Sequence, residues 1–362
     1  CALLALLSLP SSAVTAGDFY AATVPVEDQS ERARIQASRE GLVSVLIRLT
    51  GSRTLENDPR IESMLRDVAT YMVEYSYVTL PATGGSDPGG LGIRVQYDRN
   101  GIDQALRSGR LPIWPLNRPP LLLWLVSDDP VTGPQALHDD QIIAVLDSAF
   151  ARRGLVPVYP LYDLEDQLAL EVEQVRDFDG EAIAAASNRY PVQGWLAVRV
   201  YETSSGHWRA AWMMDVAGQS LLRQVQAESL EALLGEVVDQ AVDSIASRYA
   251  YVAGDSAGHI ELEISGVATY RDYSRLMALL DSQTMVQEID IRVLEGDRLR
   301  LRLAIEGGRD RLLDSLSREA ALQVLPPEPI RSTASEASVL AGESILNTGE
   351  LRVERLRWIS GR

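Results

Sequence analysis

The most constraining stretch of this 362-residue sequence is a pair of alternating runs, 286–294 and 298–305, that flank the turn sequence Glu295-Gly296-Asp297. Apolar and charged residues alternate in both runs, and this period of two is typical of paired strands that bury one face. The apolar set expected on the buried face is Ile289, Ile291, Val293, Leu299, Leu301, Leu303 and Ile305. The charged set expected on the solvated face is Glu288, Asp290, Arg292, Arg298, Arg300 and Arg302.

The segments around this hairpin suggest a complete small domain over 254–325. A strand is predicted at 259–264 and a helix at 270–280, and after the hairpin come a helix at 309–320 and a strand at 322–325. The order β-α-β-β-α-β is that of a ferredoxin-like fold, in which both helices cover one face of the sheet.

A second domain is predicted at 119–253, after a linker punctuated by prolines. The continuous apolar run 121–126 is typical of a strand covered on both faces. A helix over 139–153, a hairpin around 204–206 and a closing helix over 229–248 follow. These elements predict a small α/β domain with a mixed sheet.

The first domain is expected at 17–118 and has an α+β pattern. A strand over 19–26 precedes a helix that Asp28 or Ser30 can cap, and the later strands are expected at 71–80 and 91–97. The predicted fold class is therefore multi-domain α/β and α+β, with small mixed-sheet modules followed by the ferredoxin-like domain.

The two ends of the chain look different from these domains. Residues 326–362 are rich in proline and serine, so we expect a flexible segment with a candidate last strand over 351–359.

Residues 1–16 are uncharged, with an apolar run up to Leu9 and with Val14 and Ala16 placed as in a signal-peptide cleavage site. We expect a secretion signal whose basic start lies before Cys1, and a mature protein that begins at Gly17.

Export predicts a periplasmic protein without a membrane-spanning segment in its mature chain, because the apolar run is shorter than the roughly 20 residues that a spanning helix needs. The alternative is a lipoprotein acylated at Cys1, but here the apolar run follows the cysteine instead of ending at it. The predicted mature chain contains no cysteine, so neither disulfides nor a cysteine nucleophile is expected.

Charge excludes further classes of protein. The 34 basic residues are all arginine and face 51 acidic residues, for a net charge of −17. The absence of lysine excludes P-loop, kinase-type and Schiff-base chemistry, each of which needs that side chain. The negative balance argues against binding to nucleic acid, which depends on a basic surface.

A long motif near the start carries a family resemblance. The motif is Phe19-Tyr20-Ala21-Ala22-Thr23-Val24-Pro25-Val26-Glu27-Asp28-Gln29-Ser30, and further matching segments lie at 32–34, 42–51, 71–77, 121–126 and 194–196. On these residues the chain resembles the proteobacterial domain of unknown function 2066 family over most of 17–250. The resemblance implies an exported protein without an assigned activity, so it supplies no functional residues.

Several residue patterns could carry chemistry, and each has a simpler structural explanation. Gly254-Asp255-Ser256-Ala257-Gly258 matches the nucleophile-elbow pattern, but a helix is expected before it and a strand after it, the reverse of an elbow. His138, His207 and His259 lack metal-ligand spacing. Asp177, Asp179 and Glu181 suit a helix start better than a calcium loop.

Six tryptophans are present, and Trp195, Trp208 and Trp212 fall in one predicted hairpin. They are expected in the core, with an exposed sugar- or peptide-binding ladder as the alternative.

We therefore assign no catalytic, cofactor-binding or metal-binding residue and no cofactor from the sequence. The favoured hypothesis is a non-catalytic exported protein that binds another envelope protein. The alternative is a hydrolase of an envelope polymer or ester that uses carboxylates or Ser256.

Overall fold

The computed structural model describes residues 19–80, 89–326 and 353–359, so the predicted signal segment 1–16 lies outside the described residues. The chain divides into two compact units, which are described separately: Cys1–Trp114 with Pro119–Arg248, and Pro115–Arg118 with Tyr249–Arg362. The first unit contains most of the two segments expected at 17–118 and 119–253. The mixed α/β fold class with several sheets is confirmed.

The first unit contains a three-stranded sheet and a six-stranded sheet. Its elements in chain order are β1 (Ala21–Pro25), α1 (Glu31–Thr50), α2 (Glu62–Arg66), β2 (Met72–Thr79), β3 (Leu91–Tyr97), α3 (Arg99–Ser108), β4 (Pro112–Ile113), β5 (Leu121–Asp129), β6 (Gly133–Ala136), α4 (Asp140–Arg153), β7 (Pro157–Val158), α5 (Leu164–Ala169), α6 (Val172–Arg176), α7 (Gly180–Ser187), β8 (Gly194–Glu202), β9 (Trp208–Val216), β10 (Gln219–Ala227) and α8 (Leu230–Tyr249).

The small sheet has the antiparallel order β1-β3-β2 and packs against α1. Ser30 caps the start of α1 by accepting a hydrogen bond from the Ala33 amide, as the sequence predicts. Gly51 ends the helix with φ 72°, and an added Cβ there would collide with the Cβ of Ala246. Glycine is therefore required at this position for both its left-handed backbone and the close approach of α8.

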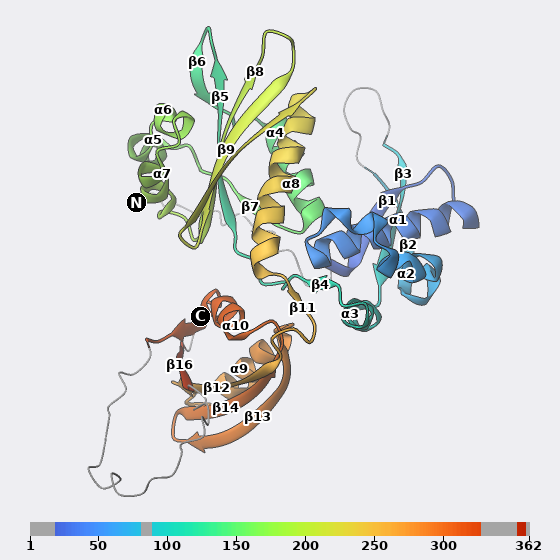
Figure 1. The fold of residues 1–362 in the computed structure, drawn as a ribbon, viewed down its shortest axis with the longest axis vertical. Helices are drawn as coiled ribbons and strands as arrows, with labels where there is room; N and C mark the ends of the chain where they lie inside the picture. Colours follow the sequence, from blue (N-terminus) through green and yellow to red (C-terminus); the bar gives the residue numbers. More distant parts are fainter. Residues whose placement is uncertain (1–18, 81–88, 327–352, 360–362) are drawn as a thin grey trace, which may run out of the picture. The chain divides into compact units, whose positions relative to one another are not determined.

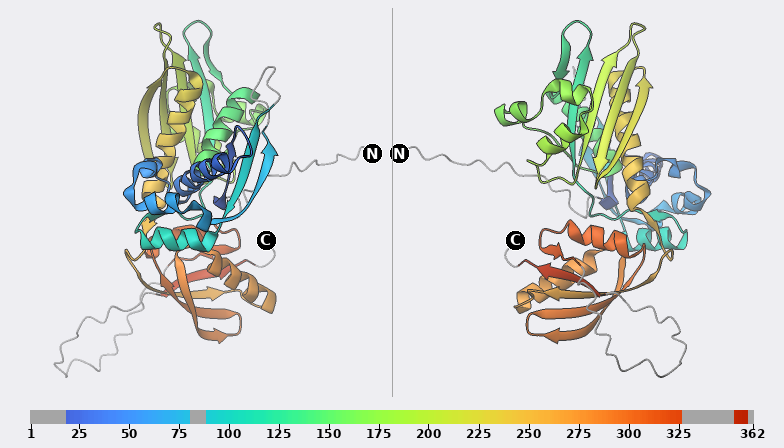
Figure 2. Two further views of the ribbon diagram at one scale, coloured as in Figure 1. Left: turned by 90° about the vertical axis from the view of Figure 1, so that its right-hand side faces the viewer. Right: turned by 60° about the vertical axis from the view of Figure 1, so that its left-hand side comes forward.

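The large sheet has the order β10-β9-β8-β5-β6, with β7 paired to β5. Helices α5, α6 and α7 lie on one face, and α4 and α8 lie on the other (Figures 1 and 2). This double cover explains why every residue from Leu121 to Val126 is buried, as the continuous apolar run predicts. The outer strands β6 and β10 were not predicted from the sequence, because they are short or largely exposed.

A buried ion network joins α1, α4 and α8 within the first unit. The Arg153 side chain is 1% exposed and donates to Asp239 Oδ1 at 2.8 Å, Asp243 Oδ1 at 2.6 Å and the Gly51 carbonyl at 2.8 Å. Because two carboxylates and a helix-terminal carbonyl converge on one guanidinium, the three helices are held in a defined register.

The second unit is built on a five-stranded sheet. Its elements are β11 (Tyr251–Val252), β12 (Gly258–Ser265), α9 (Tyr270–Ser282), β13 (Val286–Glu295), β14 (Arg298–Ile305), α10 (Arg309–Ser317), β15 (Leu322–Val324) and β16 (Val353–Trp358). The predicted β-α-β-β-α-β order is present from β12 to β15. Leu276 and Leu280 of α9 and Leu312 and Leu316 of α10 are fully buried over the sheet.

The strand order β13-β14-β12-β16-β15 departs from the simple ferredoxin-like arrangement. The candidate last strand exists as β16, which pairs parallel with β12 and antiparallel with β15. It is inserted inside the sheet, so β15 lies one position further out than expected. Trp358 Nε1 donates to Asp272 Oδ1 at 3.1 Å and fastens β16 to the start of α9.

The predicted hairpin forms, but its register corrects the predicted face of one residue. Ile289 pairs with Leu303 and Ile291 with Leu301, whereas a bulge at Arg292 places Val293 opposite Arg300 and Leu294 opposite Leu299. Since each bulge inserts one residue, it exchanges the two faces of the strand beyond it. Edge strand β13 is also less buried than predicted, with Ile291 45% and Leu294 62% exposed.

Candidate functional site

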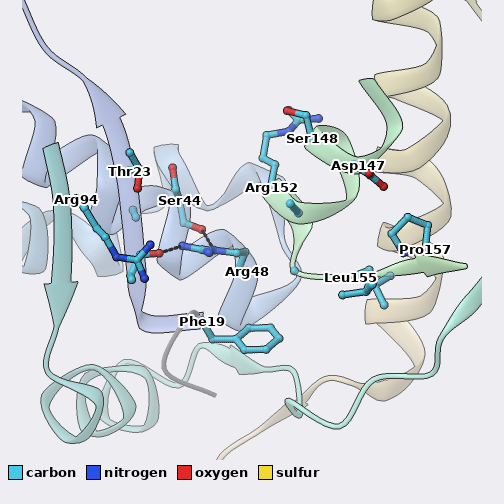
Figure 3. A pocket seen from close by; sticks show the side chains of 15 residues that line it. Phe19, Thr23, Ser44, Arg48, Arg94, Asp147, Ser148, Arg152, Leu155 and Pro157 are labelled. Carbon is cyan, nitrogen blue, oxygen red and sulfur yellow. Dashed lines mark hydrogen bonds between the residues drawn. The ribbon is translucent and has the colours of Figure 1, made fainter. Parts of the chain in front are cut away.

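The first unit carries a pocket of about 640 Å³ that is lined by three arginines and is here called the arginine pocket (Figure 3). Arg48 comes from the last turn of α1, Arg94 from β3 and Arg152 from the end of α4. Volumes of this size are typical of small-molecule sites. The remaining lining residues are Phe19, Ala21, Ala22, Thr23, Ser44, Asp147, Ser148, Ala151, Gly154, Leu155, Val156 and Pro157.

Backbone carbonyls orient Arg48 within the arginine pocket. Its guanidinium donates to the carbonyl of Ala21 on β1 and, at 3.4 Å, to that of Ser44 one helical turn earlier. In Figure 3 the heads of Arg48 and Arg94 extend toward the same point beside β1 from opposite sides. Two guanidinium groups therefore meet at one place although their residues are 46 positions apart in the sequence.

The opposite wall of the arginine pocket is mixed. Arg152 donates to Asp239 Oδ2 at 3.1 Å, so part of its charge is directed toward α8. Asp147 accepts a hydrogen bond from the Tyr159 hydroxyl at 2.8 Å. Burial, assisted by that carboxylate, raises the pKa of Tyr159 far above its ordinary value, so the phenol remains a donor. Leu155 and Pro157 add apolar surface.

A second candidate surface lies on α5 and the residue before its first turn. Leu161, Leu164 and Leu168 are 68%, 70% and 79% exposed. Leu164 and Leu168 are one helical turn apart and therefore lie on the same side of α5. We call these three residues the leucine surface. Contiguous exposed apolar patches are uncommon on monomeric proteins and are typical of interaction surfaces.

The base of the leucine surface is held by a buried carboxylate. Asp166 is 2% exposed; its Oδ1 accepts from Arg189 at 2.7 Å, and its Oδ2 accepts from the Tyr190 hydroxyl at 2.6 Å and the Tyr162 amide at 2.8 Å. Burial, with the hydrogen bond to Asp166, raises the pKa of Tyr190 to about 12. Hydrogen bonds from Arg189 hold the pKa of the helix-capping Asp163 well below its usual range. The short helix is therefore fixed to its support.

Behind α5 lies an aromatic pocket of about 550 Å³. His138 stacks on Tyr162 with ring centroids 4.7 Å apart, and Trp124 meets Tyr162 edge to face at 5.9 Å. Tyr162 has φ 51°, an uncommon conformation for a non-glycine residue, and Asp166 receives its amide hydrogen bond. This pocket gives His138 a neighbour that the sequence analysis did not anticipate.

Ser256 lies in an exposed turn with φ 53°, between the two-residue strand β11 and strand β12. A nucleophile elbow needs a helix directly after the serine, and here a strand follows. His259 lies three residues further on in β12 and is also exposed. The strand after the motif is as predicted, whereas the two-residue strand β11, and not the expected helix, directly precedes it.

The other candidate residues serve local structure. Asp139, next to His138, caps α4 by accepting from the Gln141 and Ile142 amides, and Asp179 caps α7 through the Ala182 amide. His207 lies at the β8–β9 turn within 3.2 Å of the Ser205 hydroxyl. Within the described ranges, no group of three or more His, Cys, Asp and Glu residues is placed to hold a metal ion.

The tryptophans are mainly core residues, as predicted. Trp195 and Trp212 are 5% and 0% exposed, while Trp208 at the start of β9 is half-buried. Trp195 opposes Asp215 and Trp212 opposes Val198, so the two indoles lie on opposite faces of the sheet. The double cover of this sheet explains how both faces can bury a tryptophan.

Sequence reasoning missed both the arginine pocket and the leucine surface. Arg48 and Arg94 carry no local signal, because arginines at a helix end and in a strand are ordinary surface residues. The leucine surface had a weak signal: the spacing of Leu161, Leu164 and Leu168 also fits an inward helix face. The exposed fractions of these leucines and the burial of Asp166 on the other side of α5 show that they face outward.

Comparison with known families corrects the predicted resemblance. The profile of a family described as a domain of unknown function (DUF8605) matches residues 13–115, whereas the domain of unknown function 2066 family is not the one found. The resemblance based on the motif at 19–30 was therefore wrong. Both families lack an assigned function, and no curated protein matches the chain.

Some solved structures resemble part of the chain weakly. The Thermus thermophilus Protein Y N-terminal domain is 11% identical, with 35% of this chain and 94% of that chain covered and a TM-score of 0.19. A competence-damaged protein (CinA) superfamily protein from Enterobacter cloacae is 15% identical, with 36% and 79% covered and a TM-score of 0.19. A competence or damage-inducible protein from Enterobacter asburiae is 14% identical, with 36% and 84% covered and a TM-score of 0.18. TM-scores this low carry no argument about function.

Proposed function

We propose that this protein is exported to the periplasm and acts there by binding another protein of the cell envelope, without catalysing a reaction. Two observations support the proposal: the signal-like segment 1–16 and the leucine surface on α5. Among the described residues, none of the helices is long and apolar enough to span a bilayer.

The leucine surface is the observation that carries the binding function. Leu161, Leu164 and Leu168 present apolar side chains that would lose water on contact with a partner, at roughly 25 cal/mol per Å² of area buried. Asp166 and its hydrogen-bond partners already hold α5 in place. A surface that is ordered before binding loses little conformational entropy when the complex forms.

The charge around the leucine surface indicates the chemistry of the partner. Eight carboxylates lie between Asp163 and Glu181, and two arginines, Arg176 and Arg189, pair with four of them. An acidic surround favours partners that carry basic side chains and repels acidic ones. The partner segment is therefore an apolar stretch flanked by lysine or arginine.

The proposal can be tested by crosslinking and capture from a periplasmic extract, followed by quantitative mass spectrometry. The test variant is Leu164→Ser/Leu168→Ser, and the matched control is Leu222→Ser, which changes a 53% exposed leucine on β10 of the same unit. The wild type and the control should capture the same protein, and the double variant should lose it. The captured protein, once purified, should bind at least about tenfold more weakly to the double variant.

Three results would contradict the proposal. The first is equal capture by the double variant and the wild type. The second is the absence of any crosslinked partner. The third is fractionation of the protein with the cytoplasm, because the proposal requires export and a mature chain that begins at Gly17.

A further inference from the structure

We propose that the arginine pocket binds a small organic oxyanion, either a phosphate monoester or a carboxylate, with a compact apolar body. This site is separate from the leucine surface, so the proposal stands or falls independently of the proposed function. Its support is the convergence of Arg48 and Arg94, the apolar residues that line the same pocket and the volume of about 640 Å³.

The two converging arginines match an oxyanion in chemistry and shape. A guanidinium offers parallel N–H donors in one plane, and these fit two oxygens of a carboxylate or phosphate. Arg48 is oriented by the carbonyls of Ala21 and Ser44, and Arg94 projects from the central strand of the small sheet. Donors that are held before binding favour a ligand that needs both at once.

The charge of the whole chain makes this local concentration of arginines informative. At a net charge of −17 the average field repels anions, so an anion that binds must be held by nearby groups. The carboxylate that lines the arginine pocket is Asp147, and Asp239 accepts from Arg152 at its edge. Arg48 and Arg94 are therefore the groups that bind the anion, and the negative charge of Asp147 weakens that binding.

The apolar residues define the rest of the ligand. Phe19, Leu155 and Pro157 line the arginine pocket together with the guanidinium groups, and Figure 3 shows Phe19 below Arg48, and Leu155 and Pro157 below Asp147. Most small-molecule sites combine such apolar walls with a few polar groups that fix orientation. A ring-sized body attached to the anionic group fits this combination.

Isothermal titration calorimetry with three probes of similar size tests the proposal. Phenyl phosphate and benzoate carry the two oxyanions, and benzamide is the uncharged control. The principal variant is Arg94→Gln, since Arg94 is exposed on its strand and its removal should leave the fold intact. The matched control is Arg209→Gln, which removes one exposed positive charge from β9, outside the arginine pocket.

We expect at least one of the two anions to bind with a one-to-one stoichiometry and benzamide not to bind. Arg94→Gln should weaken binding about tenfold, whereas Arg209→Gln should change it less than about twofold. Asp147→Asn should strengthen binding, because it removes the opposing carboxylate. Binding of phenyl phosphate alone, of benzoate alone or of both supports the proposal and identifies the oxyanion.

The proposal is overturned if neither anion binds at concentrations up to about 10 mM. It is equally overturned if benzamide binds as well as the anions, or if Arg209→Gln weakens binding as much as Arg94→Gln. Arg48→Gln serves as a second variant, and its fold is checked by circular dichroism because Arg48 also contacts β1.

Discussion

The large sheet of the first unit and the sheet of the second unit bury their strands in different ways. In β5 the six consecutive residues Leu121–Val126 are at most 2% exposed, since helices cover both faces. In β14, Leu299, Leu301 and Leu303 are fully buried while the alternating residues Arg298 and Arg300 are exposed. The comparison shows that the periodicity of a strand records how many of its faces are covered.

The largest expected effect tests the double cover of β5. Leu122→Ala and Leu123→Ala should each lower the free energy of unfolding by about 2–5 kcal/mol, because each removes buried contacts and leaves a cavity on its own face. Urea unfolding followed by tryptophan fluorescence measures this. Leu222→Ala, on the exposed edge strand β10, is the control and should cost less than about 1 kcal/mol. A small effect at either buried leucine would mean that one face of β5 is open.

Neighbouring positions in β14 should behave unequally. Leu301→Ala should cost about 2–5 kcal/mol, since Leu301 is fully buried beneath α9 and α10. Arg300→Ala should cost less than about 1 kcal/mol, because the Arg300–Glu263 ion pair at 2.8 Å is partly exposed. Amide hydrogen exchange in peptides that cover 298–305 measures both effects. Equal losses would show that the charged face is also covered.

A smaller effect should appear at alkaline pH in the layer that contains α5. Burial raises the pKa of Tyr162 to about 12 from an ordinary 10.0. The folded state therefore keeps this proton at pH values at which the unfolded state loses it. The contribution of Tyr162 to the free energy of unfolding is thus fully present below pH 10 and decreases as the pH rises toward about 12. In Tyr162→Phe, the decrease in the free energy of unfolding over this pH range should be smaller than in the wild type by on the order of 1–2 kcal/mol.

Urea unfolding at several alkaline pH values tests the Tyr162 prediction, and the chain suits the test because it has no lysine to titrate in the same range. Tyr270→Phe is the control, since Tyr270 is 84% exposed in the second unit. An identical pH dependence of wild type and Tyr162→Phe would show that Tyr162 does not stabilise the α5 layer through its neutral phenol.

Much of the architecture could be predicted because the relevant signals are local. The helix cap at Ser30, the capping aspartates Asp139 and Asp179, and the alternation of β14 all depend on residues within a few positions of each other. The candidate sites lacked such signals. Arg48, Arg94 and Arg152 belong to three different elements, and nothing in their immediate neighbours indicates that they line one pocket.

The sequence by itself determined the local elements of this protein, its mixed α/β class and its negative net charge, with arginine as the basic residue in place of lysine. Tertiary structure alone decided that β16 is inserted between β12 and β15, that the bulge at Arg292 turns Val293 toward Arg300, and that α5 presents its leucines outward. The physical reason is the range of the interactions. Capping and periodicity act within one or two turns of chain, whereas strand insertion and pocket formation depend on contacts between residues that are distant in sequence.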